Sequence, residues 1–210
     1  MLALGMIAAL AMPGTAQATP QLGDLGVKQS MSVKASNGES LEGKDLRAIQ
    51  LATYTAASVD GNTIVGYDLT TNTALASDIT AAAKAAGATD TNLTVNGKND
   101  PMVWVVKNLT DSRSDPWSGK LRNFCNSLAK QTNFAKQDGT AVSTLSQDKA
   151  TMSTGNVLVP GIYAIVDRTP ATTTLSSGTA IKTTASIMMM NGTAVNGVNQ
   201  LRTAGGTTDR

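Results

Sequence analysis

Apolar and polar positions alternate in the first part of the chain that follows residue 24. Residues 25–35 show the two-residue period of a half-buried strand. Residues 46–54 (LRAIQLATY) predict a second strand, and residues 59–65 predict a hairpin with Asp60-Gly61 at its tip. We expect these three segments to pair in sequence order. The apolar positions of the first segment are Val27, Met31 and Val33.

Helical spacing replaces this alternation in the middle of the chain. Ser77-Asp78 predicts the cap of a helix over residues 79–86, and Gly87 predicts its end. Asp100-Pro101 predicts the start of a short helix, although its β-branched residues leave a strand as the alternative. Ser118 precedes an amphipathic helix that runs to about Lys130. The apolar positions of the two later helices are Met102, Val105, Val106 and Leu109, and Leu121, Phe124, Cys125 and Leu128.

Strand patterns return in the last third. We expect strands at residues 142–145, at residues 162–166 after a break at Pro160-Gly161, and within residues 179–190. The Thr- and Ser-rich residues 169–179 predict a surface loop. The expected fold class is mainly β, with a helical insert of two or three short helices.

An export signal is predicted at the start of the chain. Residues 2–12 form an uncharged apolar run, and Ala16-Gln17-Ala18 has the small-x-small pattern that signal peptidase recognises. We expect residues 1–18 to be a signal peptide, cleaved after Ala18, whose basic n-region is missing because Met1 adjoins the apolar run. The run is too short to span a bilayer, so we expect no membrane association after cleavage. The alternative is a buried core segment.

Composition excludes several classes of function. Residues 19–210 are long enough for one domain with a hydrophobic core, since 41% of the chain is hydrophobic. The 17 basic and 15 acidic residues are scattered, so we expect no nucleic-acid partner. The chain has no histidine, the commonest general base and metal ligand. Its single cysteine forms no internal disulfide.

Few residues offer chemistry. Cys125 lacks a histidine to generate a thiolate, and its helical position favours core packing over a nucleophile. Trp104 and Trp117 could stack on sugars, but their positions beside predicted helices favour packing. We therefore predict no catalytic, cofactor-binding or metal-binding residues, no cofactor and no enzymatic activity. Turn and cap roles explain most of the scattered acids, which are Asp60, Asp68, Asp78, Asp100, Asp111, Asp115 and Asp167.

Two further motifs carry little functional information. Met188-Met189-Met190 would alternate faces in a strand, so at least one methionine would point away from the others, toward a neighbouring domain. Three glycosylation patterns are expected by chance in a chain rich in Asn and Thr, and we attach no function to them. They begin at Asn92, Asn108 and Asn191.

Several stretches in order resemble a known family. They are GKDLRAIQLATY (43–54), GYDLTTNTALASDITAAAKAAG (66–87), the segment from Trp117 through LRNF (121–124), and PGIYAIVD (160–167). Together they resemble the N-terminal domain of sortase-assembled, isopeptide-forming fimbrial proteins of Gram-positive bacteria, especially the major pilins of bifidobacteria and actinomycetes.

This resemblance implies an immunoglobulin-like β sandwich that forms one bead of a pilus shaft. It implies neighbouring pilin subunits and a sortase as partners of the full-length protein, an extracellular location on the cell wall, and a part in adhesion. The family's L-P-x-T-G signal, its apolar anchor with a basic tail and its V-Y-P-K-like motif are absent. We therefore expect the chain to be truncated before later domains.

The family also forms Lys to Asn isopeptide bonds beside a buried carboxylic acid. Lys28 and Lys34 lie on the first predicted strand and Asn191 lies near the last, but no acid stands out as their partner. We expect no such bond here, because a strand lysine ordinarily faces solvent.

Two other functions remain open. An adhesin or carbohydrate-binding module with a host glycan or matrix ligand would need exposed aromatic residues on one patch: Trp117 or Tyr54, Tyr67 and Tyr163. A secreted hydrolase would need two acidic side chains in a cleft.

Overall fold

The computed structural model describes residues 23–35, 39–60, 63–95, 97–109, 119–181 and 187–192, with the backbone alone for residues 23–24, 56–60, 63–67, 95 and 187–192. The predicted signal peptide and Trp117 lie outside these ranges.

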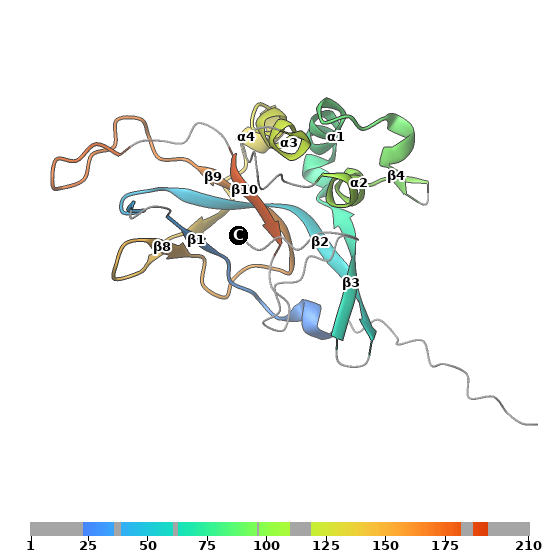
Figure 1. Ribbon diagram of the computed structural model, residues 1–210, viewed down its shortest axis with the longest axis horizontal. Helices are drawn as coiled ribbons and strands as arrows, with labels where there is room; N and C mark the ends of the chain where they lie inside the picture. The colour runs from blue at the N-terminus through green and yellow to red at the C-terminus, as the bar shows by residue number, and fades with distance from the viewer. Residues whose placement is uncertain are drawn as a thin grey trace, which may run out of the picture.

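A five-stranded antiparallel sheet forms the centre of the protein (Figure 1). Its strands are β2 (Leu46–Asp60), β3 (Thr63–Thr71), β6 (Thr140–Val142), β9 (Gly161–Asp167) and β10 (Ile187–Gly192). They lie in the order β10-β9-β2-β3, and β6 also pairs with β2. The predicted strand at residues 46–54 and the strands of the hairpin after it are confirmed, whereas the tip residues 61–62 lie outside the described ranges.

A smaller antiparallel sheet lies against one face of this central sheet. It consists of β1 (Ser32–Lys34), β7 (Thr144–Leu145) and β8 (Thr151–Ser153), in the order β1-β8-β7. The chain passes from the central to the smaller sheet at Ser143, between β6 and β7. The expectation that the first strand pairs with the second is wrong, because Val33 of β1 lies opposite Met152 of β8.

Helices form a layer on the other face of the central sheet (Figure 1). They are inserted between β3 and β6, together with the short hairpin of β4 (Thr94–Val95) and β5 (Lys98–Asn99). The helical segments are η2 (Thr73–Leu75), α1 (Ala76–Ala85), η3 (Asp90–Leu93), α2 (Pro101–Asn108), α3 (Lys120–Leu128) and α4 (Thr132–Ala135); η1 (Gly23–Gly26) precedes β1. The protein thus combines helices with antiparallel sheets, an arrangement that is compatible with the expected β-rich fold.

Two apolar cores separate the three layers. The helix-side core lies between the central sheet and the helices, and the sheet-side core lies between the two sheets. Strand β9 is buried along its whole length because Ile162, Ala164 and Val166 enter the helix-side core, whereas Tyr163 and Ile165 enter the sheet-side core. Fully covered strands of this kind explain why residues 162–166 are almost continuously apolar.

The predicted helices are confirmed with shifted ends. Helix α1 begins at Ala76 and ends before Gly87, whose φ of +104° is the left-handed conformation that favours glycine. Helix α2 has Asp100 as its N-cap and Pro101 as its first residue, as predicted, and α3 buries the expected face. Among the described residues, no helix is long and apolar enough to cross a membrane.

The segments near the two ends of the described chain match their predictions in part. Val33 and Met31 are buried as a half-buried strand requires, but Val27 is 56% exposed. The last predicted strand is present as β10 from Ile187, while residues 182–186 lie outside the described ranges. Most of residues 169–179 are exposed, as expected of a surface loop, although Thr169 is buried.

Candidate functional site

One edge of β2 has a gap between two partner strands. Strand β6 pairs with β2 as far as Ala48, and β3 pairs with it from Ala52 onward. No described strand lies beside residues 49–51 on this edge, although β9 continues along the other edge. Backbone carbonyls in the gap therefore need other hydrogen-bond partners.

Asn72 supplies partners for two of these carbonyls. Its side-chain Nδ2 donates to the carbonyl oxygen of Gln50 at 2.9 Å, and its backbone N–H donates to that of Leu51, also at 2.9 Å. Its Oδ1 accepts a hydrogen bond from the N–H of Ala74 at 3.1 Å, which caps η2. Both ends of the Asn72 amide are thus oriented by the backbone.

Gln50 and Tyr163 form a second oriented group at the gap. The Tyr163 hydroxyl donates to the carbonyl oxygen of Val159 at 2.6 Å and accepts from Nε2 of Gln50 at 3.1 Å. Because the hydroxyl proton is used on Val159, the nitrogen of the Gln50 amide must face the tyrosine. Burial raises the pKa of Tyr163 from the ordinary 10.0 to about 12, so this hydroxyl keeps its proton, and remains a donor, to a higher pH than an exposed tyrosine does.

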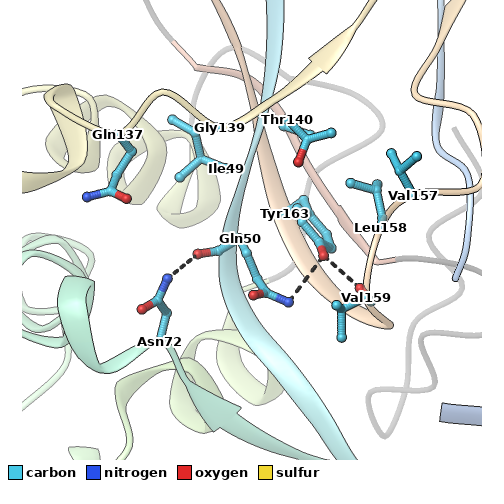
Figure 2. A pocket seen from close by; sticks show the side chains of 11 residues that line it. Ile49, Gln50, Asn72, Gln137, Gly139, Thr140, Val157, Leu158, Val159 and Tyr163 are labelled. Carbon is cyan, nitrogen blue, oxygen red and sulfur yellow. Dashed lines mark hydrogen bonds between the residues drawn. The ribbon is translucent and has the colours of Figure 1, made fainter. Parts of the chain in front are cut away.

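These groups line a hollow of about 240 Å³, which we call the amide pocket (Figure 2). Figure 2 shows the Gln50 amide beside the hydroxyl of Tyr163, with Val159 bonded to the same hydroxyl. None of the lining residues is charged at neutral pH. They are Ala48, Ile49, Gln50, Asn72, Gln137, Gly139, Thr140, Val157, Leu158, Val159 and Tyr163.

Gly139 allows the chain to pass close to β2 at the wall of this pocket. Its φ of +67° is left-handed, and a Cβ there would lie 2.9 Å from the carbonyl oxygen of Ala48. A larger residue would push β6 away from β2 and change the width of the pocket.

The amide pocket keeps unused hydrogen-bonding groups. Within the part of the chain that the structure describes, no hydrogen bond engages Oε1 of Gln50, Oε1 of Gln137 or Oγ1 of Thr140. One of the two side-chain N–H groups of Asn72 also makes no hydrogen bond to the described residues. Donors and acceptors thus lie side by side without a formal charge.

A second polar cluster joins the start of β2 to the end of β9. Lys44 Nζ lies 2.9 Å from Oδ2 of Asp167, and their side chains are 14% and 0% exposed. The other carboxylate oxygen of Asp167 accepts from the N–H of Thr169 at 2.9 Å and from its hydroxyl, which in turn accepts from the N–H of Asp45 at 2.8 Å. This cluster links two strand ends, which is a structural role.

Most of the cysteine, tryptophan and tyrosine side chains considered as functional candidates are buried where the structure describes them. Cys125 is buried and forms no disulfide, and Trp104 is 8% exposed, so both pack as predicted. Tyr54 and Tyr163 are 4% and 3% exposed, which removes them from an exposed aromatic patch. The side chain of Tyr67 lies outside the described residues.

The buried Asp78 and the partly buried Asp100 accept hydrogen bonds from backbone and side-chain donors. Asp78 does not cap its own helix; its carboxylate accepts from the N–H of Phe134 at 2.8 Å and from Asn133 Nδ2 at 3.0 Å, so it caps α4. Asp100 accepts from the N–H of Thr71 at 3.0 Å. Among the described residues, no group of three Cys, Asp or Glu side chains could hold a metal ion.

Of the two lysines considered for an isopeptide bond, only Lys34 lies on a strand, and that strand belongs to a different sheet from Asn191; Lys28, predicted on the same strand, precedes β1. Lys34 is exposed on β1 of the smaller sheet, and Lys28 is also exposed. Asn191 lies on β10 of the central sheet, opposite Tyr163 of β9. Of the methionine triplet the structure describes only the backbone.

Two of the glycosylation patterns have structural uses for their asparagines. The Asn92 side chain accepts from the N–H of Thr89 at 2.8 Å in a capping box, and Asn108 Nδ2 donates to the carbonyl of Trp104 at 2.8 Å.

Comparison of the chain with family models, with curated proteins and with solved structures gave no match. The function must therefore be inferred from the chain's own residues.

The sequence did not reveal the amide pocket. Its polar residues are single amides and hydroxyls that carry no motif: Asn72 lies 22 positions from Gln50, and Tyr163 lies 113 positions from Gln50. Only the gap between β6 and β3 brings them together, and no local pattern encodes that gap.

Proposed function

We propose that this protein is a structural subunit of a Gram-positive cell-surface pilus, assembled covalently by a sortase on the cell wall. The observation that carries the proposal is the order of its layers. Two antiparallel sheets share an apolar core, and a helical insert lies between β3 and β6 on the outer face of the larger sheet. An immunoglobulin-like sandwich with such an insert is what the resemblance to pilin N-terminal domains implies.

A shaft subunit must be held together without disulfides, because the chain has one cysteine. Long-range contacts meet this need. The paired residues of β2 and β9 are 108 (Thr53 and Gly161) to 121 (Leu46 and Asp167) positions apart in sequence, and the Lys44–Asp167 pair closes the end of that ladder. Such non-local pairing holds distant parts of the chain together in the central sheet.

No enzymatic role forms part of this proposal. The amide pocket contains neither of the paired carboxylates that a glycosidase needs. The buried Asp78 and the partly buried Asp100 are occupied by hydrogen bonds with Phe134 and Thr71, respectively.

The test is an immunoblot of cell-wall extracts from the bacterium that carries the gene, with antibody to this domain. A pilus subunit gives a ladder of very large species that resist SDS, and the ladder collapses when the sortase gene is deleted. A single soluble band in both strains would contradict the proposal.

The second candidate is a secreted or surface binding module, and the amide pocket is the observation that favours it. This candidate predicts the single band, so the same blot separates the two.

A further inference from the structure

We propose that the amide pocket binds one neutral sugar unit. The pocket offers the three features that such a ligand requires: an uncharged lining, adjacent donors and acceptors, and apolar walls.

The absence of charge selects the class of ligand. A charged group that enters the pocket would lose water without gaining a counter-ion among the eleven lining residues. A purely apolar ligand would instead strip water from Gln50, Asn72 and Thr140 without replacing its hydrogen bonds. A neutral molecule with many hydroxyl groups avoids both penalties.

The spare groups match the hydroxyls of a sugar. Each sugar hydroxyl donates one hydrogen bond and accepts others. Oε1 of Gln50 can accept, the second N–H of Asn72 can donate, and the Thr140 hydroxyl can do both. Val157, which is 52% exposed, supplies the apolar surface for the C–H groups of the ring; Ile49 and Leu158 also line the pocket but are each only 2% exposed.

The polar groups are oriented before any ligand arrives. Tyr163 holds the Gln50 amide (Figure 2). The N–H of Ala74 holds the Asn72 amide. Preorganised groups lose little conformational entropy when they bind. The volume of about 240 Å³ lies below the range of about 300–1,000 Å³ typical of drug-sized ligands, which favours a single ring.

This inference does not rest on the pilus assignment. A shaft subunit would use the pocket for adhesion along the fibre, and a monomeric module would use it directly. The binding experiment below and the sortase immunoblot therefore fail independently.

The experiment is an NMR titration of the isotopically labelled chain, in which the side-chain amide signals of Gln50 and Asn72 are followed. The probes are neutral hexoses, 6-deoxyhexoses and N-acetylhexosamines, with N-acetylneuraminic acid as a charged sugar and N-acetylglycine methylamide as a peptide. We expect saturable shifts of both amides with at least one neutral sugar, and none with the charged sugar or the peptide.

Variants assign the shifts to the pocket. The Thr140 hydroxyl makes no hydrogen bond to the described residues, and valine has nearly the same shape as threonine. Thr140→Val should therefore remove only the hydrogen bond to the sugar and weaken binding by up to about tenfold. Gln50→Met should weaken binding similarly. The control Gln131→Met lies outside the pocket, where its Nε2 donates to Ser127 O at 3.3 Å, and should bind like the wild type.

Three results would overturn the inference. They are unmoved Gln50 and Asn72 signals with every neutral sugar, equal binding by Thr140→Val and the wild type, and binding of the peptide or the charged sugar in place of a neutral one.

Discussion

The Lys44 ammonium lies 2.9 Å from Oδ2 of Asp167, although 123 positions separate the two residues in sequence. Lys44 precedes β2 and Asp167 ends β9, and Leu46 pairs with Asp167 at the end of the ladder between these strands. The Asp167 side chain has no exposed surface, so this carboxylate depends on the protein, rather than on water, for its stabilisation.

We expect Lys44→Met to destabilise the protein by about 3 kcal/mol, because it removes this cation from a fully buried carboxylate. The measurement is the free energy of unfolding in urea. Lys84→Met is the matched control: its partner Asp90 is 2.5 Å away, but the two side chains are 44% and 85% exposed. An exposed pair contributes less than about 1 kcal/mol. Equal losses in the two variants would show that burial of Asp167 does not matter.

Thr71 joins β3 to helix α2 through its hydroxyl. The hydroxyl accepts from the N–H of Met102 at 3.0 Å and donates to Oδ1 of Asp100. Thr71→Val leaves the Met102 N–H and one bond of Asp100 unsatisfied inside the protein, so we expect a loss of about 1–3 kcal/mol. Its neighbour Thr70 is exposed on the same strand, and Thr70→Val should change stability by less than about 0.5 kcal/mol. Thermal denaturation of both variants tests this, and similar midpoints would refute the role of the hydroxyl.

Local signals predicted local elements well. Asp100-Pro101 marked the start of α2, Gly87 marked the end of α1, and the apolar spacing of 121–128 identified α3. These signals act through backbone geometry and hydrogen bonds within a few residues, so they can be seen in sequence.

Pairing between distant segments could not be predicted in the same way. The alternation around Met31 and Val33 indicated a strand, but their partners lie at Thr154 and Met152. Alternation shows which face is buried and not which strand lies alongside. Asp78 gave a similar error: an acid in the first turn of α1 was expected to cap it, but its partner Phe134 lies 56 positions away.

The backbones of β9 and β2 lie very close together at Gly161. A Cβ at this position would lie 2.2 Å from the carbonyl oxygen of Ala52. We expect Gly161→Ala to destabilise the protein by at least about 1–3 kcal/mol, because two backbones must separate. Gly26→Ala is the control, since a Cβ there meets nothing within 4 Å. The urea midpoints measure both, and a Gly161→Ala variant as stable as Gly26→Ala would mean that the strands shift freely.

The raised pKa of Tyr163 predicts how the stability of the protein changes at alkaline pH. Burial raises its pKa to about 12 from the ordinary value of 10.0, so between these values the folded protein holds a proton that the unfolded chain has released. Stability from this group is therefore fully present below about pH 10 and is lost as the pH rises through about 12. Tyr163→Phe removes the ionisable hydroxyl and should flatten this part of the stability profile, while it also frees the Gln50 amide from its partner. The measurement is the unfolding free energy of both proteins across this range, together with the near-ultraviolet absorbance of tyrosinate. If the wild type and Tyr163→Phe lose stability in parallel, the tyrosine hydroxyl is not the group that burial protects.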